Sequence, residues 1–473
     1  MKRQTRVFFV LLISITFSSL LAAQTVSSDT VVYKWVQSQG ISITSGNRVK
    51  LLKSGVEKFD EMFRDIRNAK YAIDLEYFNF RNDSIANVLF NLLAVKAKQG
   101  VRVRALYDAF GNMSNNRPLK HKHEKAIRKR GIQLYKWDPI TFPWVNHVFP
   151  RDHRKIVVID YNIAYTGGMN VADYYLVGLP KIGPWRDMHM RIEGEASKEL
   201  QKIFNDGWYK QTRKKHTDIE EVSSVLNHQD SLLLQLTGNK DEWEQALVVA
   251  DSLLKQDVEE EDGYHAGHLN VAESDDGTVI TTHKQAASKY HTANIAILNR
   301  VPRKTPKIMR DFYATALDAA QESVYIINPY FSPTPKVRKA IERAIKRGIE
   351  VNIMIPTKSD IPITPDAAYR RVNKLRKKGA TVYLYDAGFH HSKILMVDGK
   401  FCTVGSTNLD SRSLRYDYEE NAVVFDKAVT DELVQMFKTD IKDSRLLTDE
   451  IWKKRSGWRK FVGWAASLIS WVL

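Results

Sequence analysis

The sequence predicts an α/β fold of two lobes related by a pseudo-two-fold axis, each lobe being a β-sheet flanked by helices. Two observations predict it: a strand–helix–strand pattern occurs twice, and each copy is followed by the same polar residues at the same spacing. The composition, 43% hydrophobic and 27% charged over 473 residues, is that of a globular protein. It excludes a largely disordered chain.

The first copy of the pattern begins near Tyr71. An apolar segment, 72–80, precedes a helix-like stretch, 85–98, and then the alternating residues 101–106. Strands that alternate with helices at this spacing predict parallel strands covered by helices. We assign the first lobe to residues 30–210.

The second copy begins at Ser323. Residues 324–330 are strand-like, 336–346 helix-like and 349–355 strand-like again. This order repeats that of the first copy. We assign the second lobe to residues 306–445.

Residues 211–305, between the two copies, have a different character. They contain the acidic run 257–262, several glycines and few long apolar periods. A run of like charges is most simply a solvated loop. We therefore predict that this segment is a linker or insert.

The N-terminus has the pattern of a secretory signal. Lys2, Arg3 and Arg6 precede an apolar run, 7–23, and polar residues follow. Because the run approaches membrane-spanning length, residues 1–23 are either a signal peptide or an uncleaved N-terminal anchor. Both versions predict that the body of the protein is exported.

The C-terminal segment, 446–473, is basic and rich in Trp. Lys453, Lys454 and Arg459 precede thirteen mostly apolar residues that include Trp464 and Trp471, too few to span a bilayer. This pattern predicts an amphipathic helix at an anionic membrane surface, the alternative being a terminal helix docked on a lobe. The net charge of +16 likewise favours phosphate-bearing partners, either anionic lipid or nucleic acid.

Each copy ends in a His-x-Lys-x4-Asp motif. Two such motifs with matching surroundings are a far stronger signal than one. The six residues are His153, Lys155 and Asp160 in the first motif, and His391, Lys393 and Asp398 in the second.

Small and amide residues follow each motif at equal distances. The pairs Gly167-Gly168 and Gly405-Ser406 begin fourteen residues after the histidines, and Asn170 and Asn408 lie seventeen after them. Small residues let the backbone approach a ligand, and an amide can donate to an anionic oxygen. We predict that Gly168, Asn170, Ser406 and Asn408 bind phosphate.

The spacing within each motif places His and Lys together. The apolar runs 156–159 and 394–397 indicate buried strands, on which residues two apart share a face. His390 should then point away from its neighbour His391. Each motif thus directs an imidazole and an ammonium group into one cavity.

These two motifs resemble the paired HKD motifs of the phospholipase D superfamily, and the resemblance extends from Tyr71 to Phe425. The segments 152–160 (DHRKIVVID), 185–189 (WRDMH) and 408–414 (NLDSRSL) are similar to those of bacterial cardiolipin synthases. The resemblance implies two phospholipase D-like lobes and a covalent phosphohistidine. It also implies that neither a metal nor another cofactor is required.

The resemblance implies a role for each motif residue. His153 is the nucleophile and His391 the acid and then the base, although the near-symmetry leaves the reverse assignment open. Lys155 and Lys393 neutralise charge on the phosphoryl oxygens.

Acidic residues should orient the two imidazoles. The family pattern points to an acid some thirty positions after each His, which selects Asp187 and Glu419. Asp160 and Asp398, at the strand ends, are expected to hold the structure rather than carry protons.

The preferred function is that of a phosphatidyltransferase that joins two phosphatidylglycerol molecules at the extracytoplasmic or periplasmic face of a bacterial membrane, peripherally bound or N-terminally anchored. A hydrolytic phospholipase D is the first alternative. An exported nuclease is the second, less favoured because such nucleases are often short single-copy chains. A non-catalytic scaffold is a distant third.

Overall fold

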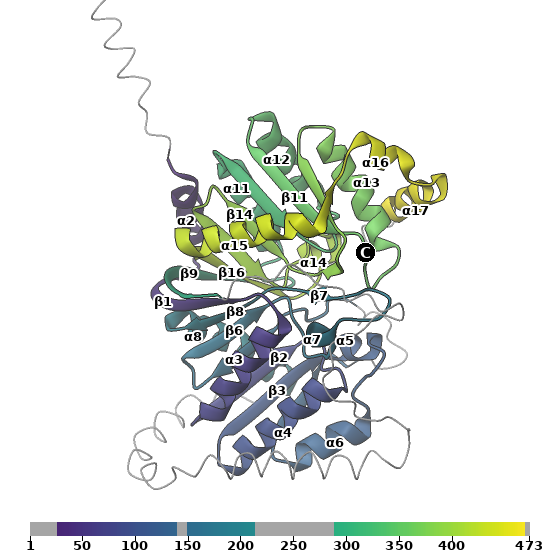
Figure 1. Cartoon of the computed structure of the whole chain (residues 1–473). Coiled ribbons are helices and arrows are strands. Elements are labelled where there is room, and N and C mark those ends of the chain that lie inside the picture. The colour runs from purple at the N-terminus through teal and green to yellow at the C-terminus, as the bar shows by residue number, and fades with distance from the viewer. Residues whose placement is uncertain (1–25, 140–148, 213–287, 469–473) are drawn as a thin grey trace, which may run out of the picture.

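The computed structural model describes residues 26–139, 149–212 and 288–468 (Figure 1). The predicted signal or anchor and most of the predicted insert lie outside these ranges. Within them, no helix is both long enough and apolar enough to cross a bilayer.

The first half of the chain contains eight strands and seven helices among the described residues. The strands are β1 (Ile43–Leu52), β2 (Ala72–Tyr77), β3 (Arg102–Asp108), β4 (Gln133–Trp137), β5 (Ile156–Ile159), β6 (Ile163–Gly167), β7 (Trp185–Arg186) and β8 (His189–Glu193). The helices are α2 (Ser28–Ser38), α3 (Gly55–Asn68), α4 (Ser84–Lys98), α5 (Ala109–Ser114), α6 (His121–Lys129), α7 (Tyr174–Val177) and α8 (Glu195–Thr212).

The second half repeats this order. Its strands are β9 (Tyr290–Arg300), β10 (Ser323–Ile327), β11 (Glu350–Pro356), β12 (Thr381–Tyr385), β13 (Phe389–His390), β14 (Ile394–Val397), β15 (Phe401–Gly405), β16 (Glu419–Phe425) and β17 (Ser444–Leu446). Its helices are α11 (Ile308–Ala319), α12 (Pro335–Lys346), α13 (Thr364–Arg376), α14 (Ser411–Arg415), α15 (Lys427–Asp440), α16 (Asp449–Lys454) and α17 (Gly457–Leu468).

The main sheet confirms the pseudo-two-fold arrangement. From the centre outward, the first half runs β1-β8-β6-β5-β2-β3-β4 and the second β9-β16-β15-β14-β10-β11-β12, with β17 at the edge. Because β1 and β9 pair antiparallel, the expected two sheets form one continuous sheet, with the first half below and the second above in Figure 1.

The sheet is mixed, whereas the pattern predicted parallel strands throughout. β2, β3 and β4 are parallel, as are β10, β11 and β12, because helices connect them. The motif strands β5 and β14 pair antiparallel with their neighbours. Short connections such as that between β5 and β6 permit only antiparallel pairing.

Strand β9 corrects the predicted limits of the insert. It lies within residues 211–305, yet it pairs with both β1 and β16 at the centre of the sheet. Its position matches that of β1 in the other half. The second half therefore begins at or before Tyr290 and not at 306.

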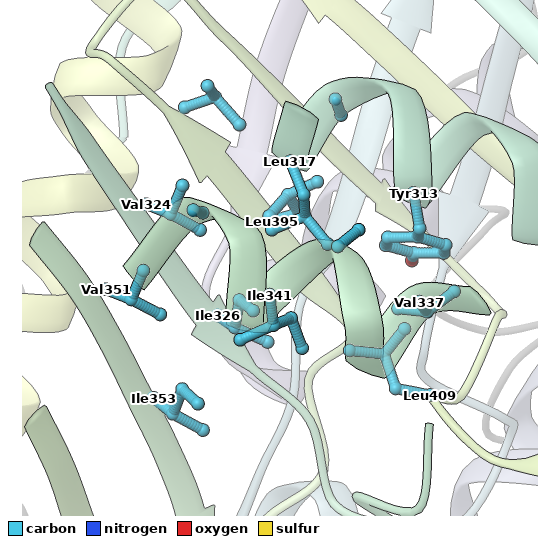
Figure 2. Packing of buried hydrophobic residues seen from close by; sticks show 14 of the residues in the cluster. Tyr313, Leu317, Val324, Ile326, Val337, Ile341, Val351, Ile353, Leu395 and Leu409 are labelled. Atoms are coloured by element: carbon cyan, nitrogen blue, oxygen red, sulfur yellow. The ribbon is translucent and has the colours of Figure 1, made fainter. Parts of the chain in front are cut away.

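Each half has an apolar core between its sheet and its covering helices, and a third cluster spans both halves. Figure 2 shows the core of the second half, where side chains of β10 and β11 lie beside those of α11 and α12. The buried residues there include Leu317, Val324, Ile326, Ile341, Val351 and Ile353. These cores fix the strands that carry the two motifs.

The C-terminal helix α17 docks on the second half through small residues. Gly463 and Ala466 are buried, and a Cβ atom on Gly463 would lie 2.5 Å from the carbonyl oxygen of Asp366 in α13. Trp458, Phe461 and Trp464 remain exposed. The docked-helix alternative is thus correct for the position of α17.

Candidate active site

The two motifs meet where the halves of the molecule join. The backbone N–H of His153 donates to the carbonyl oxygen of Tyr418 at 3.0 Å, and that of His391 to the carbonyl oxygen of Arg186 at 2.6 Å. Beside them β7 pairs with β13. Each motif histidine is therefore held by backbone from the opposite half.

The acids that orient the imidazoles are the predicted ones, but they act across the halves. Nδ1 of His153 lies 3.1 Å from Oε1 of Glu419, and Nδ1 of His391 lies 2.7 Å from Oδ2 of Asp187. The sequence offsets had associated each acid with the histidine of its own copy. The pairing is crossed because Asp187 follows β7, next to β13, while Glu419 follows Tyr418, which holds His153.

This geometry fixes which nitrogen can react. With Nδ1 donating to a carboxylate, Nε2 of each ring keeps its lone pair, as a nucleophile or a base requires. Among the described residues, neither Nε2 has a hydrogen-bond partner. Both can therefore face a substrate.

The site favours neutral imidazoles in the free protein. Burial, and then the charges of Lys155 and Lys393, lower the pKa of His153 well below its usual value. Burial and Lys393 also lower the pKa of His391, against the opposing effect of Asp187. Because His391 and Lys393 both act on His153, the two motifs share one electrostatic environment.

The two lysines are buried cations at this site. Nζ of Lys155 donates to the carbonyl oxygen of His153, and Nζ of Lys393 to that of His391. Burial lowers the pKa of Lys393 to about 8 and lowers that of Lys155 as well. An incoming phosphate would favour the ammonium form of both lysines, since a nearby anion raises the pKa of an amine.

The small residues Gly168 and Ser406 hold the orienting acids, and their contact with phosphate stays a prediction. A Cβ atom on Gly168 would lie 2.1 Å from Oδ1 of Asp187, so only glycine fits there. In the other half the hydroxyl of Ser406 donates to Glu419 and accepts from the backbone N–H of Glu420 at 3.0 Å. Neither residue needs to contact substrate to be essential.

Asn170 and Asn408 fit the role of ligand contacts. Both are buried, and within the described residues their side-chain oxygens have no hydrogen-bond partner. A buried amide oxygen usually accepts a hydrogen bond, which a hydroxyl of a bound substrate could donate, while the amide N–H groups can donate to a phosphate oxygen. Their contact with phosphate stays a prediction.

Asp160 and Asp398 are structural, as expected, although they belong to the motifs. Asp160 accepts from the backbone N–H groups of residues 70–72, and Asp398 from those of 321–323, at 2.7 to 3.0 Å. Both sit after the motif strand, at the opposite end from the histidine. They are not catalytic residues.

Other residues at the site were not singled out from the sequence. Lys58 of α3 is buried and donates to the carbonyl oxygen of Asn170 at 3.0 Å. Burial lowers the pKa of Lys58, and the charge of Asp187 opposes this effect. The sequence signal that could have identified Lys58 is its position on the buried face of an amphipathic helix. His390 points away, as predicted, with Nε2 3.1 Å from Asp440.

Aromatic rings form the walls around the imidazoles. Phe78 lies 5.2 Å from the ring of His153, measured between centroids. Phe389, Trp185 and Tyr330 lie 5.1, 5.7 and 5.9 Å from the ring of His391. Phe78 directly follows β2, and Tyr330 lies three residues after the end of β10, so equivalent segments of the two halves contribute to the site.

Fold and site together define a phosphodiester-processing enzyme with two histidine–lysine motifs in one composite site. The family model described as "Cardiolipin synthase, PLD-like domain" matches residues 62–208 and 313–441. The chain belongs to this phospholipase D-like family. It is an enzyme, and phosphatidyl transfer is the activity that its family supports.

Known proteins resemble most of the chain. It is 32% identical to a cardiolipin synthase of Staphylococcus aureus (strain Mu50 / ATCC 700699), over 91% of this chain and 74% of the relative. It is 29% identical to a cardiolipin synthase of Listeria monocytogenes serotype 4a (strain HCC23), over 94% and 79%. The crystal structure of a phosphatidylserine synthase from Haemophilus influenzae Rd KW20 shares the fold, with a TM-score of 0.58, 15% identity and coverage of 93% of this chain and 100% of that one.

Proposed function

We propose that this enzyme is a cardiolipin synthase that transfers a phosphatidyl group from one phosphatidylglycerol to another and releases glycerol. The observation that carries the proposal is the crossed pairing of His153 with Glu419 and of His391 with Asp187 in one basic site. The names of the relatives support the lipid substrate.

In the first half-reaction, Nε2 of His153 attacks phosphorus and the bond from phosphorus to the glycerol oxygen breaks. His391 takes part as the imidazolium, which the substrate anion and Asp187 favour, and gives its Nε2 proton to the departing oxygen. Lys155 and Lys393 offset charge on the phosphoryl oxygens. The products are free glycerol and a phosphatidyl group bonded to His153.

In the second half-reaction, a glycerol hydroxyl of the second phosphatidylglycerol replaces the first alcohol. The now neutral His391 takes the proton of this hydroxyl while its oxygen attacks phosphorus and the bond to His153 breaks. Glu419 stabilises the positive charge on His153 until it leaves. Two phosphatidylglycerols thus give one cardiolipin and one glycerol.

We also propose that the enzyme works outside the cytoplasm, against the bilayer that contains its lipid. The basic residues and apolar run of 1–23 support export, whether this segment is cleaved or remains as an anchor. Fractionation of cells that express the full chain tests this proposal. Recovery of the protein in the cytoplasmic fraction would contradict it.

The reaction is tested by incubating the purified protein with phosphatidylglycerol vesicles in EDTA and identifying the products. Equal amounts of cardiolipin and glycerol support the proposal. Phosphatidic acid instead would show a hydrolase, and activity on DNA alone a nuclease. His153→Ala and His391→Ala should each abolish the reaction, because neither half-reaction can then proceed.

A further inference from the structure

The outer face of helix α17 carries three aromatic side chains in a row. Trp458, Phe461 and Trp464 are 72%, 52% and 43% exposed. Their ring centroids lie 5.8 and 5.7 Å apart along the row. We call these three residues the aromatic stripe.

The orientation of α17 is the reverse of that expected for a terminal helix that only covers a core. Its small residues Gly463 and Ala466 face the protein, while its largest apolar side chains face outward. Burying a large aromatic side chain stabilises a fold, and this orientation forgoes that stabilisation. A contiguous exposed apolar patch of this kind marks an interaction site.

The surroundings of the stripe are predominantly basic. Lys453, Lys454 and Arg459 are exposed on α16 and α17. Three acidic neighbours are each paired with a cation: Asp449 with Arg376, Glu450 with Lys454 and Asp366 with Arg455. Helix α17 packs against α13, which ends at Arg376. The exposed cations Lys374, in the last turn of α13, and Lys377 and Lys378, just after it, add to the positive charge, and Lys378 pairs with Glu342.

A short chain of contacts leads from the stripe to the catalytic site. Gly463 contacts Asp366 near the start of α13, and four residues before that helix Asp360 accepts a hydrogen bond of 2.6 Å from the hydroxyl of Tyr330. Tyr330 is one of the aromatic residues beside His391. Four residues span at most about 14 Å, so the start of α13 lies close to the site.

We propose that the aromatic stripe and the cations beside it dock on an anionic lipid bilayer and hold the Tyr330 side of the catalytic site near the lipid surface. Trp and Phe insert at the boundary between headgroups and acyl chains, and lysine and arginine attract anionic headgroups. This inference rests on the proposed function, because it explains how a lipid reaches a buried site. It commits to a membrane surface and not to a protein partner.

The test compares the full-length protein with the triple variant Trp458→Ser, Phe461→Ser, Trp464→Ser in co-sedimentation with vesicles. The matched control is Val56→Ser with Val88→Ser, two exposed apolar residues on α3 and α4. The wild type and the control should bind phosphatidylglycerol vesicles, and the triple variant at least about tenfold more weakly. Binding should be weaker to phosphatidylcholine vesicles and should fall as salt rises.

Activity measurements on soluble and on vesicle substrates distinguish a loss of membrane docking from a loss of the catalytic reaction. On a short-chain phosphatidylglycerol below its micellar concentration, the triple variant should match the wild type, whereas on vesicles it should lose most of its activity. Equal vesicle binding by the triple variant and the wild type would overturn the docking proposal, as would equal binding to both lipids. If the wild type binds vesicles as stated but transfers no phosphatidyl group from either substrate, the proposed reaction fails and the docking surface stands.

Discussion

The two orienting acids place the two histidines in different electrostatic settings. Burial raises the pKa of Glu419 to about 7, although Lys155 and Ser406 oppose this effect. Burial acts in the same direction on Asp187, but Lys393 and His391 outweigh it and lower the pKa of Asp187 below its usual value. Asp187 is therefore ionised across the physiological range, while Glu419 titrates within it.

The first prediction concerns the pH dependence of kcat, which reports the substrate complex, where Asp187 and the substrate anion favour the imidazolium form of His391. The kcat should rise with pH through a midpoint near 7, because only ionised Glu419 can stabilise positive charge on His153, and protonation below that pH removes the negative charge. In Glu419→Gln this rise should disappear and kcat should fall by about 10²–10⁴-fold. The control Asp187→Asn should also be slow but should keep the rise near pH 7. An unchanged pH profile in Glu419→Gln would contradict the assignment of this rise to the ionisation of Glu419.

The second prediction concerns Gly168. In Gly168→Ala the new methyl group would overlap Oδ1 of Asp187, displace that carboxylate and free His391, so kcat should fall by at least about tenfold with the fold retained. Gly457→Ala, where a Cβ atom meets nothing within 4 Å, is the control and should keep full activity. Steady-state kinetics and circular dichroism measure the two effects. Full activity in Gly168→Ala would show that the close approach of Gly168 to the Asp187 carboxylate is unimportant for catalysis.

At the scale of elements, the motif aspartates fix where strands begin. Asp160 and Asp398 each have a positive φ, 49° and 53°, and accept three backbone hydrogen bonds just before or at the start of β2 and β10. Asp tolerates this backbone conformation better than most residues. In each motif the histidine and lysine precede a short strand and serve catalysis, and the aspartate follows the strand and stabilises the fold.

The third prediction follows from these contacts. Asp160→Ala and Asp398→Ala should each lower the free energy of unfolding by about 2–4 kcal/mol, because three backbone donors lose a charged acceptor. The KM of the remaining folded enzyme should be unchanged. Urea denaturation measures the first effect, with Asp431→Ala, an exposed partner of Lys427, as the control. A large change in KM with normal stability would give these aspartates a catalytic role after all.

Local patterns predicted those elements whose causes are local. The segments β2-α4-β3 and β10-α12-β11 follow from alternating strand and helix periods and were placed correctly. Strand β9 was assigned to the insert because its role depends on pairing with β1, about 240 residues earlier, which no periodicity records. The antiparallel pairing of β5 with β6 and of β14 with β15 has a local cause instead, because short connections join these strands.

In the candidate site, too, local patterns predicted some residues, whereas contacts between distant residues were not predicted. Repeated spacing identified both histidines and both lysines, and the family resemblance pointed to both orienting acids. The crossed pairing was missed because it joins residues 204 and 266 positions apart. Lys58 and Ser406 obtained their roles from contacts that only the folded chain creates.

At the scale of the whole molecule, the active site is shared by the two halves. Each histidine depends on a carboxylate and a backbone carbonyl of the other half, and β7 pairs with β13 across the junction. Neither half contains a complete histidine–acid pair. Both copies of the duplicated unit are therefore needed to build the active site as well as the fold.

The fourth prediction tests this sharing. Asp187→Asn should lower the pKa of His391, since Asp187 raises it in the wild type, and should leave that of His153 nearly unchanged. NMR titration of the enzyme with labelled histidine measures both values, with His391→Ala and His153→Ala used to assign the signals. A shift confined to His153 would support pairing within one half and contradict the structure.

The most direct test of the account uses a phosphatidyl ester of p-nitrophenol, whose leaving group departs as an anion without needing a proton. His391→Ala should then release a burst of p-nitrophenolate equal to the amount of enzyme and retain the phosphatidyl group on His153, detected by peptide mapping. His153→Ala should give no burst. A burst in His153→Ala with the label on His391 would reverse the two roles, and the absence of any labelled histidine would contradict covalent transfer through this site.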